Sequence, residues 1–205
     1  MASIPPAPAE AAGTCRLVEP SERFRDSFLE GAAEFAGEGR LDSTYAAGLG
    51  YDLGRLDRDL PSFLRDLRRL GEPPRLYGGR YQDRVYWLVD RGLYLGQTSI
   101  RPDLKTPYLM TYGGHVGYSI RPRRRRRGYG RRILGLALER CRELGLERVL
   151  VTCDEDNVAS RRIIEANGGL FESEMAMDAR TVRAEGRGGE IRKLRYWIDL
   201  SETSA

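Results

Sequence analysis

The sequence predicts a mixed α/β protein with one domain, and three observations carry that prediction. Apolar residues recur at helical spacing in the first third of the chain, and strand-like runs replace them after about residue 81. Strand and helix patterns then alternate toward the C-terminus. The length of 205 residues, with 40% hydrophobic and 31% charged residues, suits one core of ordinary size. We therefore expect a central mixed sheet flanked by helices.

Turn residues and changes of apolar period mark the boundaries of the expected elements. The predicted strands are 16–18, 85–89, 93–101, 115–121, 148–153, 170–177 and 191–200. The predicted helices begin near Ser21, Leu60, Gly128 and Asn157, and the glycine-rich stretch 36–54 is expected to be an irregular loop. The strand–helix–strand unit over 115–153 should be parallel and right-handed, and the last two strands should form a hairpin with a long polar loop.

The composition indicates a cellular compartment and argues against a secretory signal, a membrane span and a zinc site. The stretch Met1 to Gly13 has neither a basic residue nor an apolar region, so we expect a disordered tail over 1–14, a domain over 15–205 and no secretory signal. No apolar run reaches the roughly 18 residues of a membrane span. Three cysteines without C-x-x-C spacing predict free thiols in a cytoplasmic protein. A single histidine argues against a zinc site, and we expect no metal.

The positive charge of the chain is concentrated in one segment. The formal net charge is +4, yet residues 121–132 contain eight arginines and no acidic residue, and the remainder carries a net charge of −4. A protein that binds nucleic acids or membranes through general basicity would be basic over a broad surface. This distribution favours a local anion site in the segment.

The same segment joins a predicted strand to a predicted helix, an arrangement that binds anions. The strand ends at Pro122, and Gly128-Tyr129-Gly130 leads into the helix. The first helical turn presents N–H groups without helical partners, and the helix dipole favours negative charge there. Glycines permit close approach of the backbone, and arginines add charge-assisted hydrogen bonds. A pyrophosphate suits such a cradle, whereas a solvated basic loop is the simpler alternative.

Two common phosphate motifs are excluded, and a third pattern remains. No lysine follows Gly130, and Ile133 occupies the place of the third glycine in G-x-G-x-x-G. The remaining pattern, Arg125-x-x-Gly128-x-Gly130, resembles the Q/R-x-x-G-x-G/A acyl-CoA signature of the GNAT superfamily of N-acyltransferases.

The surroundings of the motif extend this resemblance to roughly residues 86–200. The motif follows a strand that ends in Arg-Pro, opens an amphipathic helix, and precedes a strand and a helix that begins Asn157-Val158-Ala159-Ser160. The run 113–122 resembles a bacterial branch of predicted acetyltransferases.

The resemblance implies a binding mode for acetyl-CoA. The strands 115–121 and 148–153 would splay apart and hold the pantetheine arm between them. Backbone groups near Ser119 and Ile120 would pair with that arm, and an N–H there would polarise the thioester carbonyl. Asn157 would contact the arm from the opposite side. The pyrophosphate would be held by the backbone amides of Arg125, Arg126, Arg127, Gly128, Tyr129, Gly130 and Arg131.

The resemblance also implies a reaction, in which a neutral primary amine attacks the thioester directly within a ternary complex. The acceptor, a small-molecule or protein amine, and the oligomeric state are not predicted. A non-catalytic acyl-CoA sensor stays open, as does a nucleic-acid-binding protein that uses the arginine loop. Against the latter stand the acidic remainder and the presence of only one aromatic residue, Tyr129, within the run. We expect neither a nucleic acid nor a membrane as partner.

The catalytic acid and base are not determined by the resemblance. Many family members carry a tyrosine seven residues after the asparagine, where it protonates the leaving thiolate, but this chain has Ile164 there. Tyr118, Cys153 and Ser160 are the polar candidates for the acid. His115 is a candidate base, although a structural, hydrogen-bonded role is the commoner interpretation of such a histidine. An aspartate or glutamate acting through water is an equal alternative.

Overall fold

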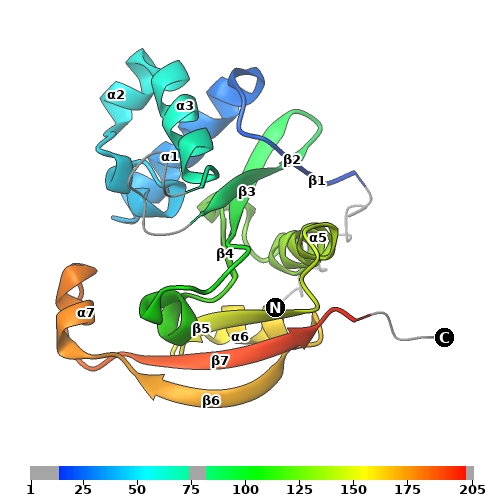
Figure 1. Ribbon diagram of the computed structural model, residues 1–205. Helices are drawn as coiled ribbons and strands as arrows, with labels where there is room; N and C mark the ends of the chain where they lie inside the picture. The colour runs from blue at the N-terminus through cyan, green and yellow to red at the C-terminus, as the bar shows by residue number, and fades with distance from the viewer. Residues whose placement is uncertain (1–13, 74–81, 202–205) are drawn as a thin grey trace, which may run out of the picture.

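The computed structural model describes residues 14–73 and 82–201, and its strands form two antiparallel sheets (Figure 1). The larger sheet has the order β1-β2-β3-β4, and the smaller one has the order β5-β7-β6. The strands are β1 (Arg16–Val18), β2 (Arg84–Asp90), β3 (Leu93–Ile100), β4 (Val116–Ile120), β5 (Arg148–Asp154), β6 (Leu170–Ala176) and β7 (Arg192–Asp199).

The helices surround these sheets and vary in length from 6 to 15 residues. They are α1 (Arg25–Gly37), α2 (Leu53–Arg58), α3 (Leu60–Leu70), α5 (Tyr129–Glu143), α6 (Val158–Glu165) and α7 (Ala179–Ala184). No described helix is long and apolar enough to cross a bilayer.

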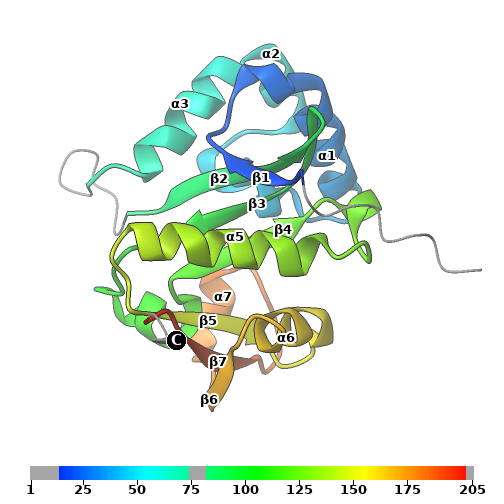
Figure 2. The same ribbon diagram turned by 90° about the vertical axis from the view of Figure 1, so that its right-hand side faces the viewer.

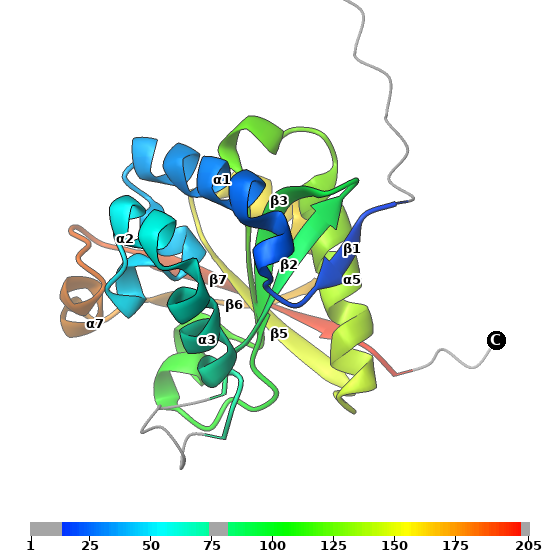
Figure 3. The same ribbon diagram turned by 90° about the horizontal axis from the view of Figure 1, so that it is seen from above.

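Both faces of the larger sheet are covered, because side chains alternate along its strands. Trp87 of β2 is buried with the apolar residues of α1 and α3, whereas its neighbour Leu88 is buried with those of α5. Figure 2 shows α5 running between the larger and the smaller sheet, and Figure 3 shows α1, α2 and α3 on the opposite side of the larger sheet from α5. The N-terminus of α5 therefore lies where the two sheets adjoin.

The two sheets are joined at His115, directly before β4. Its N–H donates to the carbonyl oxygen of Leu150 in β5 at 2.8 Å, and its own carbonyl accepts from the N–H of Arg101, directly after β3, at 2.8 Å. The close approach requires Gly114, because a Cβ atom at this position, which has φ +71°, would lie 2.5 Å from the oxygen of Leu150. Within the described residues, β4 and β5 share no strand ladder beyond this junction.

The predicted fold class is confirmed, and every predicted strand is present. The last two strands form the expected hairpin, with β7 between β5 and β6. β4 and β5 were expected to splay apart, and in the described sheets they share no ladder and approach each other at the bond from His115 to Leu150. One detail differs from expectation. The expected loops over 36–54 and between β6 and β7 contain short helical turns, including α7. Residues 1–13 of the expected tail lie outside the described residues.

Candidate functional site

A cavity of about 480 Å³ lies between β4, the arginine-rich loop and the first turns of α5 and α6, a size suited to a small-molecule ligand. Phe35, in the C-terminal half of α1, and Arg40, which follows α1, form one more wall of the cavity. Most residues predicted to bind the cofactor line this cavity, namely Ser119, Ile120, Arg125, Arg126, Gly128, Gly130, Arg131 and Asn157. Arg127 and Tyr129 are not among the lining residues, and the ring of Tyr129 packs against the core beneath α5.

One edge of β4 is turned toward the gap between the two sheets. Within the larger sheet β4 is the last strand, bonded only to β3. His115 accepts from the backbone N–H of Arg101, and the N–H of Arg121 donates to Leu95. Because hydrogen-bonded pairs alternate along an antiparallel ladder, odd-numbered residues of this stretch direct their backbone groups to β3, and even-numbered residues direct theirs away from it.

This alternation refines the expectation for Ser119 and Ile120. The backbone groups of Tyr118 and Ile120 face away from β3, whereas those of Ser119 face β3. The Ser119 hydroxyl instead donates to the carbonyl of Ser43 at 3.0 Å. The carbonyl of Ile120 accepts from Nε of Arg125 at 3.2 Å. The strand edge therefore offers the N–H groups of Tyr118 and Ile120 and the carbonyl of Tyr118.

The two glycines of the loop have different structural roles. Gly128 precedes α5 with φ +82°, and a Cβ atom there would meet nothing within 4 Å, so this position is constrained by conformation alone. A Cβ atom at Gly130 would lie 2.4 Å from Cδ1 of Ile163 on α6. A larger residue at 130 would therefore displace the Ile163 side chain, so Gly130 serves the packing of α5 on α6, whereas the sequence interpretation had assigned it to phosphate approach.

The loop backbone converges on the cavity in a form that binds anions. Arg126 has φ +63°, and Gly128 is also left-handed. A left-handed residue followed by a right-handed one, as at Gly128 and the start of α5, turns successive N–H groups toward one point. Among the described residues, no side chain caps the N-terminus of α5. The N–H groups of its first turn add to this site.

Arg121 and Arg125 are held by carboxylates of α1 and of its C-cap residue. The Arg121 side chain is buried against Glu30 and Glu34. Arg125 forms two hydrogen bonds of 2.8 Å with Glu38. Sequence reasoning missed these partners: Glu30 and Glu34 are four residues apart in the stretch that follows the helix start predicted near Ser21, but Glu38 falls in the expected loop over 36–54.

Tyr118 and Ser160 bring two hydroxyl groups together at the cavity. The hydroxyl oxygens are 2.8 Å apart, and both residues line the cavity. Burial raises the pKa of Tyr118 above its usual value, which keeps the phenol protonated at neutral pH. Ile164, at the position where a tyrosine was sought, is fully buried in the core.

Asn157 lies at the start of α6 and serves as its N-cap. Its side-chain oxygen accepts from the N–H of Ser160 at 3.0 Å. The cap uses the amide oxygen, so the amide NH₂ group is the part of this cavity-lining side chain that suits a ligand.

His115 lies at the junction of the sheets and not in the lining of the cavity. Its Nδ1 accepts from the N–H of Leu150 at 2.9 Å, which places the proton of the neutral ring on Nε2. Burial lowers the pKa of His115 to about 4. These contacts favour the structural interpretation of His115. Burial likewise raises the pKa of Cys153 to about 11, so its thiol is protonated at neutral pH.

Comparisons with known proteins agree with this architecture. The profile of the family described as "Acetyltransferase (GNAT) domain" matches residues 64–169. No curated protein matches the sequence significantly.

Solved structures resemble the chain over nearly its whole length. One is yncA, a putative acetyltransferase from Salmonella typhimurium with acetyl-CoA, at 14% identity and a TM-score of 0.53, covering 94% of this chain and 98% of that chain. Another is the microcin C7 self-immunity acetyltransferase MccE with acetyl-CoA and AMP, at 12% identity and a TM-score of 0.62, covering 95% of this chain and 98% of that chain. A third is RimJ of Mycobacterium smegmatis with CoA-disulfide, at 19% identity and a TM-score of 0.59, covering 94% of this chain and 88% of that chain. At these identities the similarity is one of fold.

Proposed function

The chain belongs to the GNAT acetyltransferase family, and on that premise we propose that it is an N-acetyltransferase, moving an acetyl group from acetyl-CoA to a primary amine. The observation that carries this proposal is the cavity of about 480 Å³, which combines an open strand edge with an anion-binding helix start. Three free, buried cysteines accord with a cytoplasmic location, which we propose as well.

The cavity fits an acyl-CoA by the chemistry of its walls. The backbone amides of the loop and the first turn of α5, with the side chains of Arg126 and Arg131, would hold the pyrophosphate. The outward backbone groups of Tyr118 and Ile120 would pair with the amides of the pantetheine arm, as an added strand does. The amide group of Asn157 would contact the arm from α6.

Acetyl-CoA supplies an activated thioester whose sulfur leaves as a thiolate. The N–H groups that β4 turns toward the gap would polarise the thioester carbonyl. We assign the proton donated to the sulfur to the Tyr118 hydroxyl, which lines the cavity and stays protonated through burial. Ser160, 2.8 Å away, would orient that hydroxyl and accept or donate in its network. As the C–N bond forms and the C–S bond breaks, the attacking nitrogen loses one proton, which passes to water. His115 is not proposed as the base, because its Nδ1 is already bonded within the sheet junction.

An acetyl-transfer assay over a panel of amines tests the proposed activity and separates an enzyme from a sensor. Acetyl-CoA consumption is measured with amino acids, polyamines and peptide N-termini, and hydrolysis without an amine is measured in parallel. We expect amine-dependent turnover well above hydrolysis. Tyr118→Phe should lower kcat by about 100-fold with little change in the KM for acetyl-CoA, the size expected for loss of a general acid.

The Ser160→Ala variant serves as the matched control for this assay, because it removes the partner hydroxyl and leaves the phenol. Its kcat should fall less than that of Tyr118→Phe. Binding of acetyl-CoA without turnover over the whole panel would support the sensor, and an unchanged kcat in Tyr118→Phe would remove the phenol from the mechanism.

A further inference from the structure

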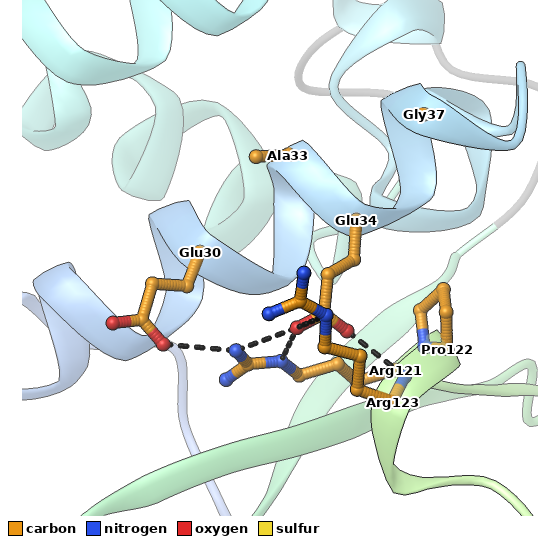
Figure 4. A pocket seen from close by; sticks show the side chains of 7 residues that line it. All are labelled: Glu30, Ala33, Glu34, Gly37, Arg121, Pro122 and Arg123. Carbon is orange, nitrogen blue, oxygen red and sulfur yellow. Dashed lines mark hydrogen bonds and ion pairs between the residues drawn. The ribbon is translucent and has the colours of Figure 1, made fainter.

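Three carboxylates of α1 and its C-cap lie against the arginine-rich loop. Glu30 and Glu34 are four residues apart on one face of α1, and Glu38 is the C-cap residue directly after the helix. Figure 4 shows Glu30 and Glu34 directed toward Arg121 and Arg123. A cavity of about 520 Å³ borders this contact, and the charged groups at its wall are paired with one another.

Glu34 binds both a side chain and the backbone of the loop. Its Oε1 accepts from Nε of Arg121 at 2.8 Å, and its Oε2 accepts from the backbone N–H of Arg123 at 3.0 Å. The side chains of Glu34 and Arg121 are only 10% and 5% exposed. Glu30 adds a second carboxylate to Arg121 at 2.8 Å. These contacts fix the point where β4 becomes the loop.

Glu38 fixes the loop one turn further along. Both of its oxygens accept from the two terminal nitrogens of Arg125, each at 2.8 Å. The same guanidinium donates through Nε to the carbonyl of Ile120. Arg125 therefore ties the loop to α1 and to the end of β4 together, in the two-bond geometry that gives Arg–carboxylate pairs their specificity.

The helix that carries these carboxylates is itself firmly anchored. Phe28 of α1 is fully buried and stacks on Trp87 of β2 with ring centroids 4.4 Å apart. Aromatic packing of this kind fixes the position of a helix on a sheet. The loop, in contrast, contains a non-glycine residue, Arg126, with φ +63°. Such a conformation persists only where its surroundings maintain it.

We propose that Glu34 and Glu38 are positioning residues, which hold the arginine-rich loop in its anion-binding conformation without touching the ligand. The inference rests on the proposed binding of acyl-CoA at this loop. It also explains why the loop has more arginines than a pyrophosphate needs, since Arg121 and Arg125 serve the attachment to α1.

The proposal makes a prediction opposite in sign to that of simple electrostatics. A carboxylate beside an anion site repels the anion, and removing it also frees Arg125 to pair with phosphate. Electrostatics alone therefore predicts tighter CoA binding in Glu38→Gln. A positioning role predicts weaker binding, because the loop amides lose their fixed arrangement. We expect the Kd for CoA to rise about tenfold.

The test measures CoA binding by isothermal titration calorimetry and amide hydrogen exchange of the loop without CoA. Glu38→Gln is the main variant, since the side chains of Glu38 and Arg125 are each 37% exposed and we expect the variant to fold. Glu34→Gln is the second variant. Asp26→Asn is the matched control, with the same change of charge on α1 at a side chain that is 94% exposed and pairs with Arg25.

Both Glu variants should show faster exchange over residues 121–128 and weaker CoA binding, whereas Asp26→Asn should match the wild type. Equal or tighter CoA binding by Glu38→Gln would overturn the positioning role. If the wild type bound no CoA, the proposed function would fail, and the exchange rates of the ligand-free loop would still decide whether α1 holds it.

A double-mutant cycle separates positioning from direct contact by Arg125. If Arg125 acts through Glu38, then Arg125→Gln combined with Glu38→Gln should weaken CoA binding no more than either change alone. Additive losses would mean that Arg125 contacts the pyrophosphate itself, and would contradict the proposal.

Discussion

The contacts of His115 join the two sheets, and the same contacts make its imidazole unsuitable as a catalytic base. Its backbone joins the two sheets, and its imidazole Nδ1 accepts from Leu150. The buried ring has a pKa lowered from 6.5 to about 4. A histidine with these properties is neutral and already bonded at the pH where a general base would have to work.

Acid should weaken the fold through this residue. The folded pKa lies below the unfolded one, so between pH 6.5 and 4 the unfolded chain binds more protons. The free energy of unfolding should therefore fall as the pH drops through this window, with His115 contributing up to about 3 kcal/mol of the loss. Denaturant unfolding at several pH values measures it.

His115→Asn is the comparison for this prediction, because an asparagine oxygen can accept from Leu150 without titrating. The stability of the variant should depend less on pH over that window. Parallel curves for variant and wild type would contradict the assigned pKa. An unchanged pH–rate profile in the variant is also expected, since the imidazole is not proposed as a catalytic base.

At the scale of elements, the site depends on how closely α5 packs on α6. Gly130→Ala should lower the free energy of unfolding by about 1 kcal/mol, because the new Cβ atom meets Cδ1 of Ile163 at 2.4 Å and the Ile163 side chain must shift. Adding Ile163→Val, which lacks that Cδ1 atom, should restore part of the loss. Chemical denaturation of the single and double variants measures both effects.

Gly128→Ala is the control for this packing prediction, since it should cost about 1–2 kcal/mol through its left-handed conformation and gain nothing from Ile163→Val. Recovery of both glycine variants by Ile163→Val, or of neither, would show that packing on α6 is not the reason for Gly130.

The elements that were located from the sequence were those with a clear apolar periodicity and with recognisable residues at their ends. The helix α3 (Leu60–Leu70) was bounded by Pro61 in its first turn and Gly71 at its end. The helices α2 and α7 each have six residues and one buried side chain, too few for a period to emerge. Their N-caps, Asp52 and Asp178, were the features that could have located them.

The site was predictable where its residues are contiguous and unpredictable where they are distant. The motif 125–130 and Asn157 were found through their resemblance to a family signature, and most of the residues named line one cavity. The contacts between Arg125 and Glu38 span 87 residues, and a single sequence does not reveal such pairings. The pairing of Tyr118 with Ser160 was hidden for the same reason, although both residues had been noted separately.

For the whole molecule, the structure divides the basic segment into two uses. The net charge of +4 arises from eight arginines in residues 121–132. Arg121 is paired with carboxylates of α1 and Arg125 with Glu38 at the C-cap of α1, while Arg126 and Arg131, together with Arg125, line the cavity. The cationic surface is therefore smaller than the sequence indicates and is centred on one helix N-terminus. This distribution suits a small polyanion better than a nucleic-acid backbone.

The most direct test of the account is calorimetric titration of CoA into the wild type and into Gly128→Glu. A Cβ atom at this position meets no atom within 4 Å, so we expect the fold to persist, while the added carboxylate places a negative charge at the anion site. We expect CoA to bind the wild type, the Kd to rise at least about tenfold in the variant, and an oligonucleotide of matched phosphate content not to compete. Equal CoA binding by both proteins, or binding of the oligonucleotide alone, would contradict the assignment of this cavity to acyl-CoA.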